Sequence, residues 1–458
     1  MPDRGRLARI LLWGIVFLPA AAFAAGAPDP PLPRGTLVEA VACRGDSSQT
    51  YTLYLPSGYE SAGRHPALLV FDPRGRSRLA AELFREAAER LGWVLLSSND
   101  TRSDGPMAPN ERALAALWPE VHRRWATDPR RIYAAGFSGG GMLAWALARA
   151  TGEVAGVIAV GARFGPRERS APLRVTTFGA AGDADFNFLE MRDAHALLAG
   201  WGASERLETF AGAHAWFPAE MAGHALDWLE VAAMREGRRS PDAALAGRLW
   251  ASEAARAEAD EAAGRPLAAS RRWRQMSRDF AGLLPVAEVA ARAERLAGTR
   301  AARAAARAEA RAERQERAWL GRFAAANARL LAAEEPPLLA RYLAEVELVE
   351  LQRRALRRDL AGETARRQLA TLLAYTSTYL ANDALARERP AAAAVLLATA
   401  LRLAPERRDL RCALARAEAR AGSPRAPLGS TLAPSPSPAA GDPRPDPQEE
   451  PCPPPAEN

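Results

Sequence analysis

Hydrophobic and polar residues follow two different periods in the first half of this chain. Between residues 35 and 236, short runs rich in β-branched and aromatic residues alternate with runs whose apolar residues recur every three or four positions. The short runs, which predict strands, are 36–43, 49–56, 66–73, 93–99, 130–137, 154–161, 173–180 and 206–212. The longer runs, which predict amphipathic helices, are 78–92, 111–125, 141–150, 188–202 and 217–234.

This order of elements predicts an α/β fold for residues 35–236. The first two strands flank a turn at Gly45 and Asp46, and we expect them to form an antiparallel hairpin. The later strands alternate with helices, which predicts a mostly parallel sheet with helices on both faces.

The composition changes near Ser240, and residues 240–422 consist almost entirely of Ala, Arg, Glu and Leu without a strand-like run. This predicts an all-α domain. Segment 384–422 resembles a tetratricopeptide unit, and segment 257–280 has a similar helix-turn-helix pattern. Stacked helix pairs form concave surfaces, so we expect a protein partner here. The alternative is a lid or spacer packed on the first domain.

The two ends of the chain have their own compositions. Residues 1–24 combine three early arginines, an apolar stretch interrupted by Pro19, and a small-x-small pattern at 22–24, as secretory signal peptides do. We therefore expect an exported protein, periplasmic or extracellular, without a permanent membrane anchor. Residues 423–458 are too rich in proline and too poor in apolar residues to fold, so a disordered tail is predicted.

Composition and charge exclude several classes of function. The chain has 48% hydrophobic and 25% charged residues, which is ordinary for a globular protein. Its net charge of +7 arises from 61 arginines against 54 acidic residues, and the two are mixed along helical runs, which argues against nucleic-acid binding. The cysteines at 43, 412 and 452 lack metal-binding spacing, and neither a metal nor a cofactor is expected.

The candidate chemistry begins at "GFSGGG", residues 136–141. It fits the G-x-S-x-G pattern of a nucleophile elbow, in which a serine sits on a tight turn between a strand and a helix. A predicted strand precedes Ser138 and a predicted helix follows it. The carboxyl end of a central strand is also where open α/β sheets place their sites, so we predict that Ser138 is a nucleophile.

A serine hydroxyl needs a base, and the base needs an acid that orients it. Of five histidines, only His214 is expected in a loop just after the last strand. Asp183 and Asp185 both follow the predicted strand 173–180. They therefore lie between Ser138 and His214 in the sequence, which is the order of the three residues in α/β sheets that carry a nucleophile elbow. The spacing from Gly182 favours Asp185 as the acid, with Asp183 as the alternative or as a helix cap.

The oxyanion formed during attack needs two N–H donors. One is expected from Gly139, directly after the serine, and the other from the loop "FDPRGR" after the first parallel strand. Because Pro73 has no N–H, Arg74 or Gly75 is predicted to supply it. In the alternative interpretation, Asp72 is a turn-forming residue and Arg74 is a substrate or surface contact.

Three segments together resemble the esterase branch of the α/β-hydrolases that includes polyhydroxybutyrate depolymerase-like and feruloyl esterase-like proteins. They are "TDPRRIYAAGFSGGGMLAWALA" (127–148), "GDADFN" (182–187) and "GAHAWFP" (212–218), and the resemblance covers roughly residues 50–233. It implies an α/β-hydrolase fold and hydrolysis of carboxylic esters through an acyl-enzyme on Ser138. His214 would be the general base and acid, and Asp185 would orient it.

The resemblance also bears on substrate binding. Those relatives commonly carry a His-Gly pair in the oxyanion loop, where this chain has "DPRG". Phe137, Trp216 and Phe217 are expected to line the acyl pocket. The sequence thus favours an exported serine esterase fused to a helical interaction module. The alternatives are an inactive scaffold or helical adaptor and a serine peptidase of the same fold.

Overall fold

The computed structural model describes residues 32–103, 105–165 and 172–422, so the predicted signal peptide and the predicted tail lie outside the described residues. The described chain divides into two compact units. The first comprises the residues up to Asp183 together with Asn187–Arg307, and the second comprises Ala184–Phe186 together with the residues from Ala308 onward.

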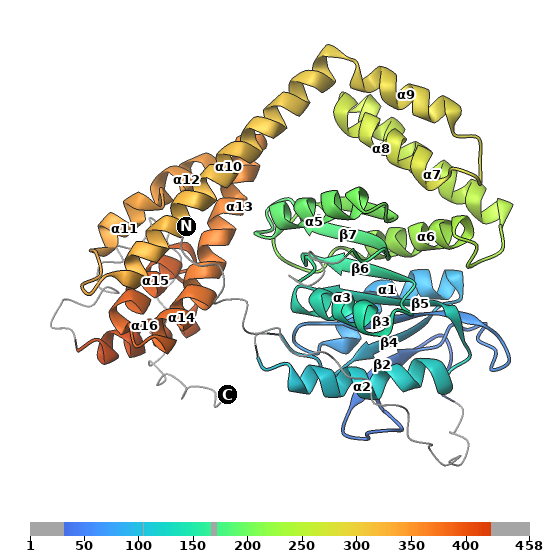
Figure 1. The fold of residues 1–458 in the computed structure, drawn as a ribbon, viewed down its shortest axis with the longest axis horizontal. Coiled ribbons are helices and arrows are strands. Elements are labelled where there is room, and N and C mark those ends of the chain that lie inside the picture. The colour runs from blue at the N-terminus through green and yellow to red at the C-terminus, as the bar shows by residue number, and fades with distance from the viewer. Residues whose placement is uncertain (1–31, 104, 166–171, 423–458) are drawn as a thin grey trace, which may run out of the picture. The chain divides into compact units, whose positions relative to one another are not determined.

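Eight strands of the first unit form one sheet in the order β1-β2-β4-β3-β5-β6-β7-β8 (Figure 1). Strand β2 pairs antiparallel with β1 and with β4, and all other neighbours are parallel. This confirms the predicted fold class, an α/β-hydrolase fold followed by a helical region. The strands are β1 Leu37–Ala42, β2 Thr50–Tyr54, β3 His65–Phe71, β4 Val94–Ser98, β5 Thr127–Phe137, β6 Gly156–Val160, β7 Thr176–Gly182 and β8 Glu205–Phe210.

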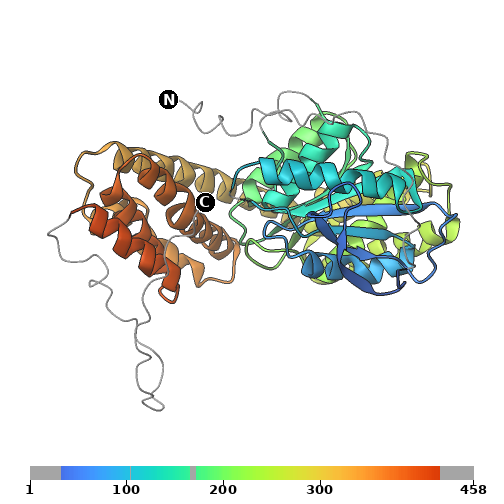
Figure 2. The same cartoon turned by 90° about the horizontal axis from the view of Figure 1, so that it is seen from below.

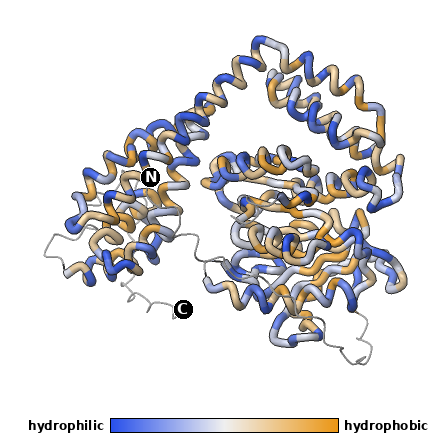
Figure 3. Tube along the Cα trace, viewed as in Figure 1, coloured by the Kyte–Doolittle hydropathy of each residue, from blue (hydrophilic) through white to orange (hydrophobic). Residues whose placement is uncertain are grey.

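Helices cover both faces of the sheet (Figures 1 and 2). The central strands consist mostly of hydrophobic residues (Figure 3), and they contribute to an apolar core on each face. In β3, Leu68 and Val70 pack in the same core as α1 and α6, whereas Leu69 and Phe71 pack with α2, α3 and α5. These helices are α1 Ser77–Leu91, α2 Ala108–Arg123, α3 Gly139–Thr151, α5 Phe188–Gly200 and α6 Ala219–Arg235.

The helical region begins where the sequence predicts it, but the compact units divide at a different place. Helices α7 Ala243–Ala262, α8 Pro266–Asp279 and α9 Ala287–Ala297 belong to the same unit as the sheet. The division falls at 307/308, within α10 Arg300–Ala332, whereas the predicted domains meet between 236 and 240. The change in composition near Ser240 coincides with the change from an α/β to an all-α structure. Packing, in contrast, determines which helices form a compact unit with the sheet.

A buried ionic cluster explains why α7 and α8 stay with the sheet. The side chain of Arg206 in β8 is 2% exposed and binds Glu208 (2.6 Å), Glu253 of α7 (2.7 Å) and Asp279 of α8 (3.2 Å). Burial opposes ionisation of Glu208, but the charges of Arg206 and its neighbours prevail and lower the pKa of Glu208 to about 2. The cluster therefore fixes both helices on an edge strand through charges that have little access to water.

The second unit is a helical bundle with its own apolar core. Its helices after α10 are α11 Leu339–Glu345, α12 Leu348–Ala355, α13 Leu360–Ala374, α14 Leu380–Ala386, α15 Pro390–Leu403 and α16 Arg408–Arg420, with a π-helical turn η2 at Tyr375–Tyr379. A buried ion pair joins Glu316 of α10 to Arg367 of α13 at 2.7 Å. Helix pairs occupy both predicted repeat-like segments, α7 with α8 and α15 with α16. None of the helices described here is long and apolar enough to cross a membrane.

We predict that Arg206→Met destabilises the first unit by about 3–5 kcal/mol, because it leaves three carboxylates buried without their shared cation. The control is Arg248→Met on the exposed side of α7, which should change the free energy of unfolding by less than about 0.5 kcal/mol. Urea unfolding followed by tryptophan fluorescence measures both. Equal stabilities of the two variants would contradict the role given to the cluster.

Candidate active site

Ser138 lies on a strained turn between β5 and α3. Its φ of 52° and ψ of −123° place a residue with a Cβ in a region that L-residues rarely adopt. The surrounding glycines make the turn feasible. A Cβ on Gly136 would lie 2.1 Å from the carbonyl oxygen of Gly140, and one on Gly140 would lie 2.0 Å from that of Phe71. The pattern around Ser138 is therefore required by close contact between backbones.

His214 reaches Ser138 although 76 residues separate them in the sequence. Nε2 of His214 lies 2.9 Å from Oγ of Ser138, a hydrogen-bond distance. The His214 ring also packs on Phe137, with ring centroids 4.6 Å apart. The structure thus brings together the two residues that the sequence singled out as nucleophile and base. In this arrangement an imidazole nitrogen can accept the serine proton.

The two candidate acids lie in the loop between β7 and α5. The Asp183 carboxylate accepts the N–H of Gly212 at 3.0 Å, and the Asp183 N–H donates to the carbonyl oxygen of Phe210 at 2.8 Å. Asp183 therefore holds the start of the loop that carries His214. Asp185 is completely buried. Its assignment as the triad acid stays a prediction.

Asp72 organises the loop after β3. Its carboxylate accepts the backbone N–H of Arg74 (2.8 Å), both backbone and guanidinium N–H groups of Arg76, and the indole N–H of Trp216 (2.8 Å). Asp72 is fully buried. Burial alone would raise its pKa, but the hydrogen bonds from Arg76, Trp216 and the backbone lower it below its ordinary value. The carboxylate therefore stays ionised and holds the turn closed.

The geometry of this loop differs from the predicted oxyanion hole. The N–H of Arg74 is engaged with the Asp72 side chain, and the N–H of Gly75 donates to the Asp72 carbonyl oxygen at 3.1 Å. Both predicted donors thus take part in the turn itself. Gly139 is the first residue of α3, and a helix leaves the N–H groups of its first turn without intrahelical partners. Its N–H is suited to the predicted role.

The three aromatic residues predicted to line the acyl pocket have different surroundings. Phe217 is 1% exposed and packs edge-on against Phe84, so it belongs to the core beneath the site. Trp216 is half-buried, and its indole N–H is held by Asp72. Phe137 is buried between Trp216 and His214. Of the three, Trp216 retains the most exposed surface.

Sequence reasoning missed the bond between Asp72 and Trp216. It joins the loop after β3 to the loop after β8 across 144 residues, and together with the bond from Gly212 to Asp183 it holds both sides of His214. The one local signal is Arg76, four residues after Asp72. That spacing suits an ion pair, but it does not reveal a tryptophan from a distant loop.

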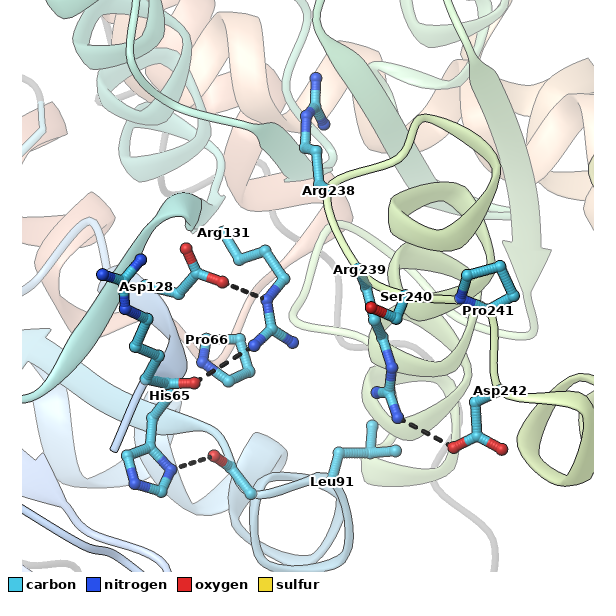
Figure 4. Close-up of a pocket in the computed structure, with 12 residues that line it drawn as sticks. His65, Pro66, Leu91, Asp128, Arg131, Arg238, Arg239, Ser240, Pro241 and Asp242 are labelled. Carbon is cyan, nitrogen blue, oxygen red and sulfur yellow. Dashed lines mark hydrogen bonds and ion pairs between the residues drawn. The ribbon is translucent and has the colours of Figure 1, made fainter. Parts of the chain in front are cut away.

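A separate open hollow of about 760 Å³ lies at the opposite end of the strands (Figure 4). It is lined by residues at the starts of β3 and β5, whereas Ser138 follows the carboxyl end of β5. Arg131 is paired with Asp128 at 2.8 Å, and Arg239 with Asp242 at 3.1 Å. The lining also carries Arg64 and Arg238, so its guanidinium groups outnumber its carboxylates. Because the hollow lies at the other end of the strands from Ser138, we assign it no part in the candidate chemistry.

The solved structures to which this chain shows some similarity include several that are titled as esterases. The monoclinic form of the Pyrobaculum calidifontis esterase is 17% identical, with a TM-score of 0.35, over 45% of this chain and 87% of that chain. Thermogutta terrifontis esterase 2 phosphorylated by paraoxon is 19% identical, with a TM-score of 0.35, over 46% and 98%. A ferulic acid esterase is 16% identical, with a TM-score of 0.32, over 39% and 89%. No protein-family model and no curated protein matches this chain.

We predict that Asp72→Ala lowers the free energy of unfolding by about 2–4 kcal/mol, because it leaves several N–H donors unpaired near a buried position. Trp216→Phe removes only one of these bonds and should cost about 1 kcal/mol. Chemical denaturation of both variants gives the comparison. If Asp72→Ala costs no more than Trp216→Phe, Asp72 does not organise this loop.

Proposed function

We propose that this protein is an exported serine hydrolase that cleaves carboxylic esters through an acyl-enzyme on Ser138. The observation that carries the proposal is the 2.9 Å contact between Ser138 Oγ and His214 Nε2 at a strained turn between strand and helix. Strain of this kind costs about 1–3 kcal/mol and is concentrated at functional sites. The choice of an ester as substrate follows the sequence resemblance described above.

The reaction proceeds in two halves. Ser138 Oγ attacks the ester carbonyl carbon while its proton passes to His214 Nε2, and the carbonyl oxygen becomes an oxyanion that the Gly139 N–H stabilises. Collapse of this intermediate breaks the bond to the alcohol, which takes the proton from His214. A water molecule then attacks the acyl-enzyme and loses a proton to His214. Collapse of this second intermediate breaks the bond to Ser138 Oγ, which takes the proton back from His214, and the carboxylic acid leaves.

In this proposal Asp185 orients His214 and stabilises its protonated form. Two features favour Asp185 over Asp183. The Asp183 carboxylate already holds the N–H of Gly212, and the complete burial of Asp185 suits an acid that is shielded from water. Asp183 instead acts as a positioning residue for the loop of His214.

We predict that the mature protein releases p-nitrophenol from short-chain acyl esters and that Ser138→Ala lowers kcat by at least about 10³-fold, since it removes the nucleophile. A fluorophosphonate probe should label the wild-type protein at Ser138 and leave the variant unlabelled. Ser48→Ala, at an exposed turn, is the matched control and should keep full activity.

Three outcomes separate this proposal from its alternatives. Folded wild-type protein without turnover of any acyl length would indicate a scaffold. Faster cleavage of peptide amides than of esters would indicate a peptidase. Label on a serine other than Ser138 would overturn the assignment of the nucleophile.

We further propose that the helices of the second unit, from residue 308 onward, form an interaction module for a protein partner. Its separate core and its buried pair of Glu316 with Arg367 support independent folding. Export to the periplasm or the cell exterior, inferred from residues 1–24, stays part of the proposal.

A deletion series tests whether ester hydrolysis requires the helices after residue 307. We predict that a chain ending at residue 307 keeps kcat/KM for p-nitrophenyl esters within about threefold of the full chain. A chain ending at residue 240 loses the α7 and α8 partners of Arg206 and should be unstable, which makes it the contrast. A loss of more than about tenfold in the folded 307-residue chain would indicate a lid instead of a module.

A further inference from the structure

The proposed reaction lacks a second oxyanion donor at the position where the sequence places it. Pro73 has no N–H, and the N–H groups of Arg74 and Gly75 are engaged with Asp72. Opening the turn to free either one would also disturb the bonds that Asp72 makes with Arg76 and Trp216. An oxyanion hole is effective because its donors are in place before the reaction, so a donor that must first break a turn is poorly suited.

Ser103, in the loop after β4, lies directly beside Gly139. A Cβ on Gly139 would be 2.3 Å from the Cβ of Ser103 and 3.1 Å from its Oγ. The side chain of Ser103 thus occupies the space next to the expected first donor. The Ser103 N–H also donates to the carbonyl oxygen of Pro73 at 2.8 Å. Ser103 therefore lies between the start of α3 and the loop after β3.

The distances allow both groups to bind one oxygen. The N and Cβ positions of a residue are about 2.5 Å apart, so Ser103 Oγ lies within about 5.6 Å of the Gly139 nitrogen. Two donors that each contact the same oxyanion at about 2.9 Å are separated by at most about 5.8 Å. The pair of Ser103 and Gly139 satisfies this limit.

The backbone that leads into Ser103 is held by Asn110. The N–H of Arg102 donates to Asn110 Oδ1 at 2.8 Å, and Asn110 Nδ2 returns a bond to the Arg102 carbonyl oxygen at 2.8 Å. One contact of the Ser103 hydroxyl, 3.4 Å from the Pro73 carbonyl oxygen, is long for a bond between two oxygens. A hydroxyl rotates about its C–O bond, so it can donate to a stronger acceptor when one forms.

We infer that the Ser103 hydroxyl is a catalytic donor that binds the oxyanion derived from the ester carbonyl oxygen, together with the Gly139 N–H. This inference rests on the proposed function. It replaces a backbone donor after β3 with a side-chain donor after β4. It also accounts for the glycine at 139, where an added Cβ would lie 2.3 Å from the Cβ of Ser103.

The test compares Ser103→Ala with Thr101→Val in the full chain. Ser103→Ala should lower kcat for p-nitrophenyl butyrate about 100-fold with little change in KM, because the lost bond forms only as negative charge develops. Affinity for a trifluoromethyl ketone, whose serine adduct carries an oxyanion, should fall by a similar factor. Thr101→Val removes a hydroxyl of the same loop, which makes an equally long contact of 3.4 Å with the Asp72 carbonyl oxygen, and should keep kcat within about threefold.

The outcomes distinguish this inference from the proposed function. If the wild-type protein and Thr101→Val turn over the ester and Ser103→Ala retains kcat within about threefold, the role of Ser103 is overturned while the esterase proposal stands. If the wild-type protein has no turnover, both fail together. Equal losses in Ser103→Ala and Thr101→Val would indicate a disturbed loop and would also overturn the specific role of Ser103.

Discussion

The candidate site depends on how one loop is held across the sheet. His214 follows β8, whereas Ser138 follows β5, and β6 and β7 lie between these strands. At the usual spacing of neighbouring strands the loop must cover about 14 Å to bring the imidazole over the serine. It is held on one side by Asp183 after β7 and on the other by Asp72 after β3. His214 is two residues from each of these contacts, so its ring is fixed from both directions.

The local features of the site could be predicted from the sequence because each arises within a short segment. The eight strands follow from runs of apolar residues, and the turn at Ser138 follows from glycines that no larger residue could replace. The bond from Trp216 to Asp72 could not be predicted in this way, because nothing near either residue indicates the other. The engagement of the Arg74 and Gly75 N–H groups could not be predicted from the sequence either. Their N–H groups are absent from the available donors because a buried carboxylate and its own carbonyl oxygen accept them first.

The domain boundary shows a similar contrast between composition and packing. Strand β8 is the last strand of the sheet, and an edge strand with unpaired backbone groups needs protection. Its charged residue Arg206 is buried and Glu208 is half-buried, and Gln275 of α8 donates to the backbone carbonyl oxygen of Glu205 at 3.2 Å. Helices α7 and α8 therefore cover the edge of the sheet. The composition of residues 240–300 resembles that of the helices after them, so composition groups them with those helices, whereas their packing places them with the sheet.

The two ends of the parallel strands have different electrostatic organisation. At the amino ends, guanidinium groups pair directly with carboxylates, as Arg131 does with Asp128, and they lie at the far end of the strands from Ser138. At the carboxyl ends, the ionised Asp72 is surrounded by donors, while the start of α3 directs N–H groups toward the space beside Ser138. An anion that forms at Ser138 would thus lie at the positive end of helix α3. The negative charge of Asp72 is offset by the donors of its own turn. This difference, more than the presence of a serine and a histidine, makes the carboxyl end of β5 the part of the first unit that is suited to stabilise a developing negative charge.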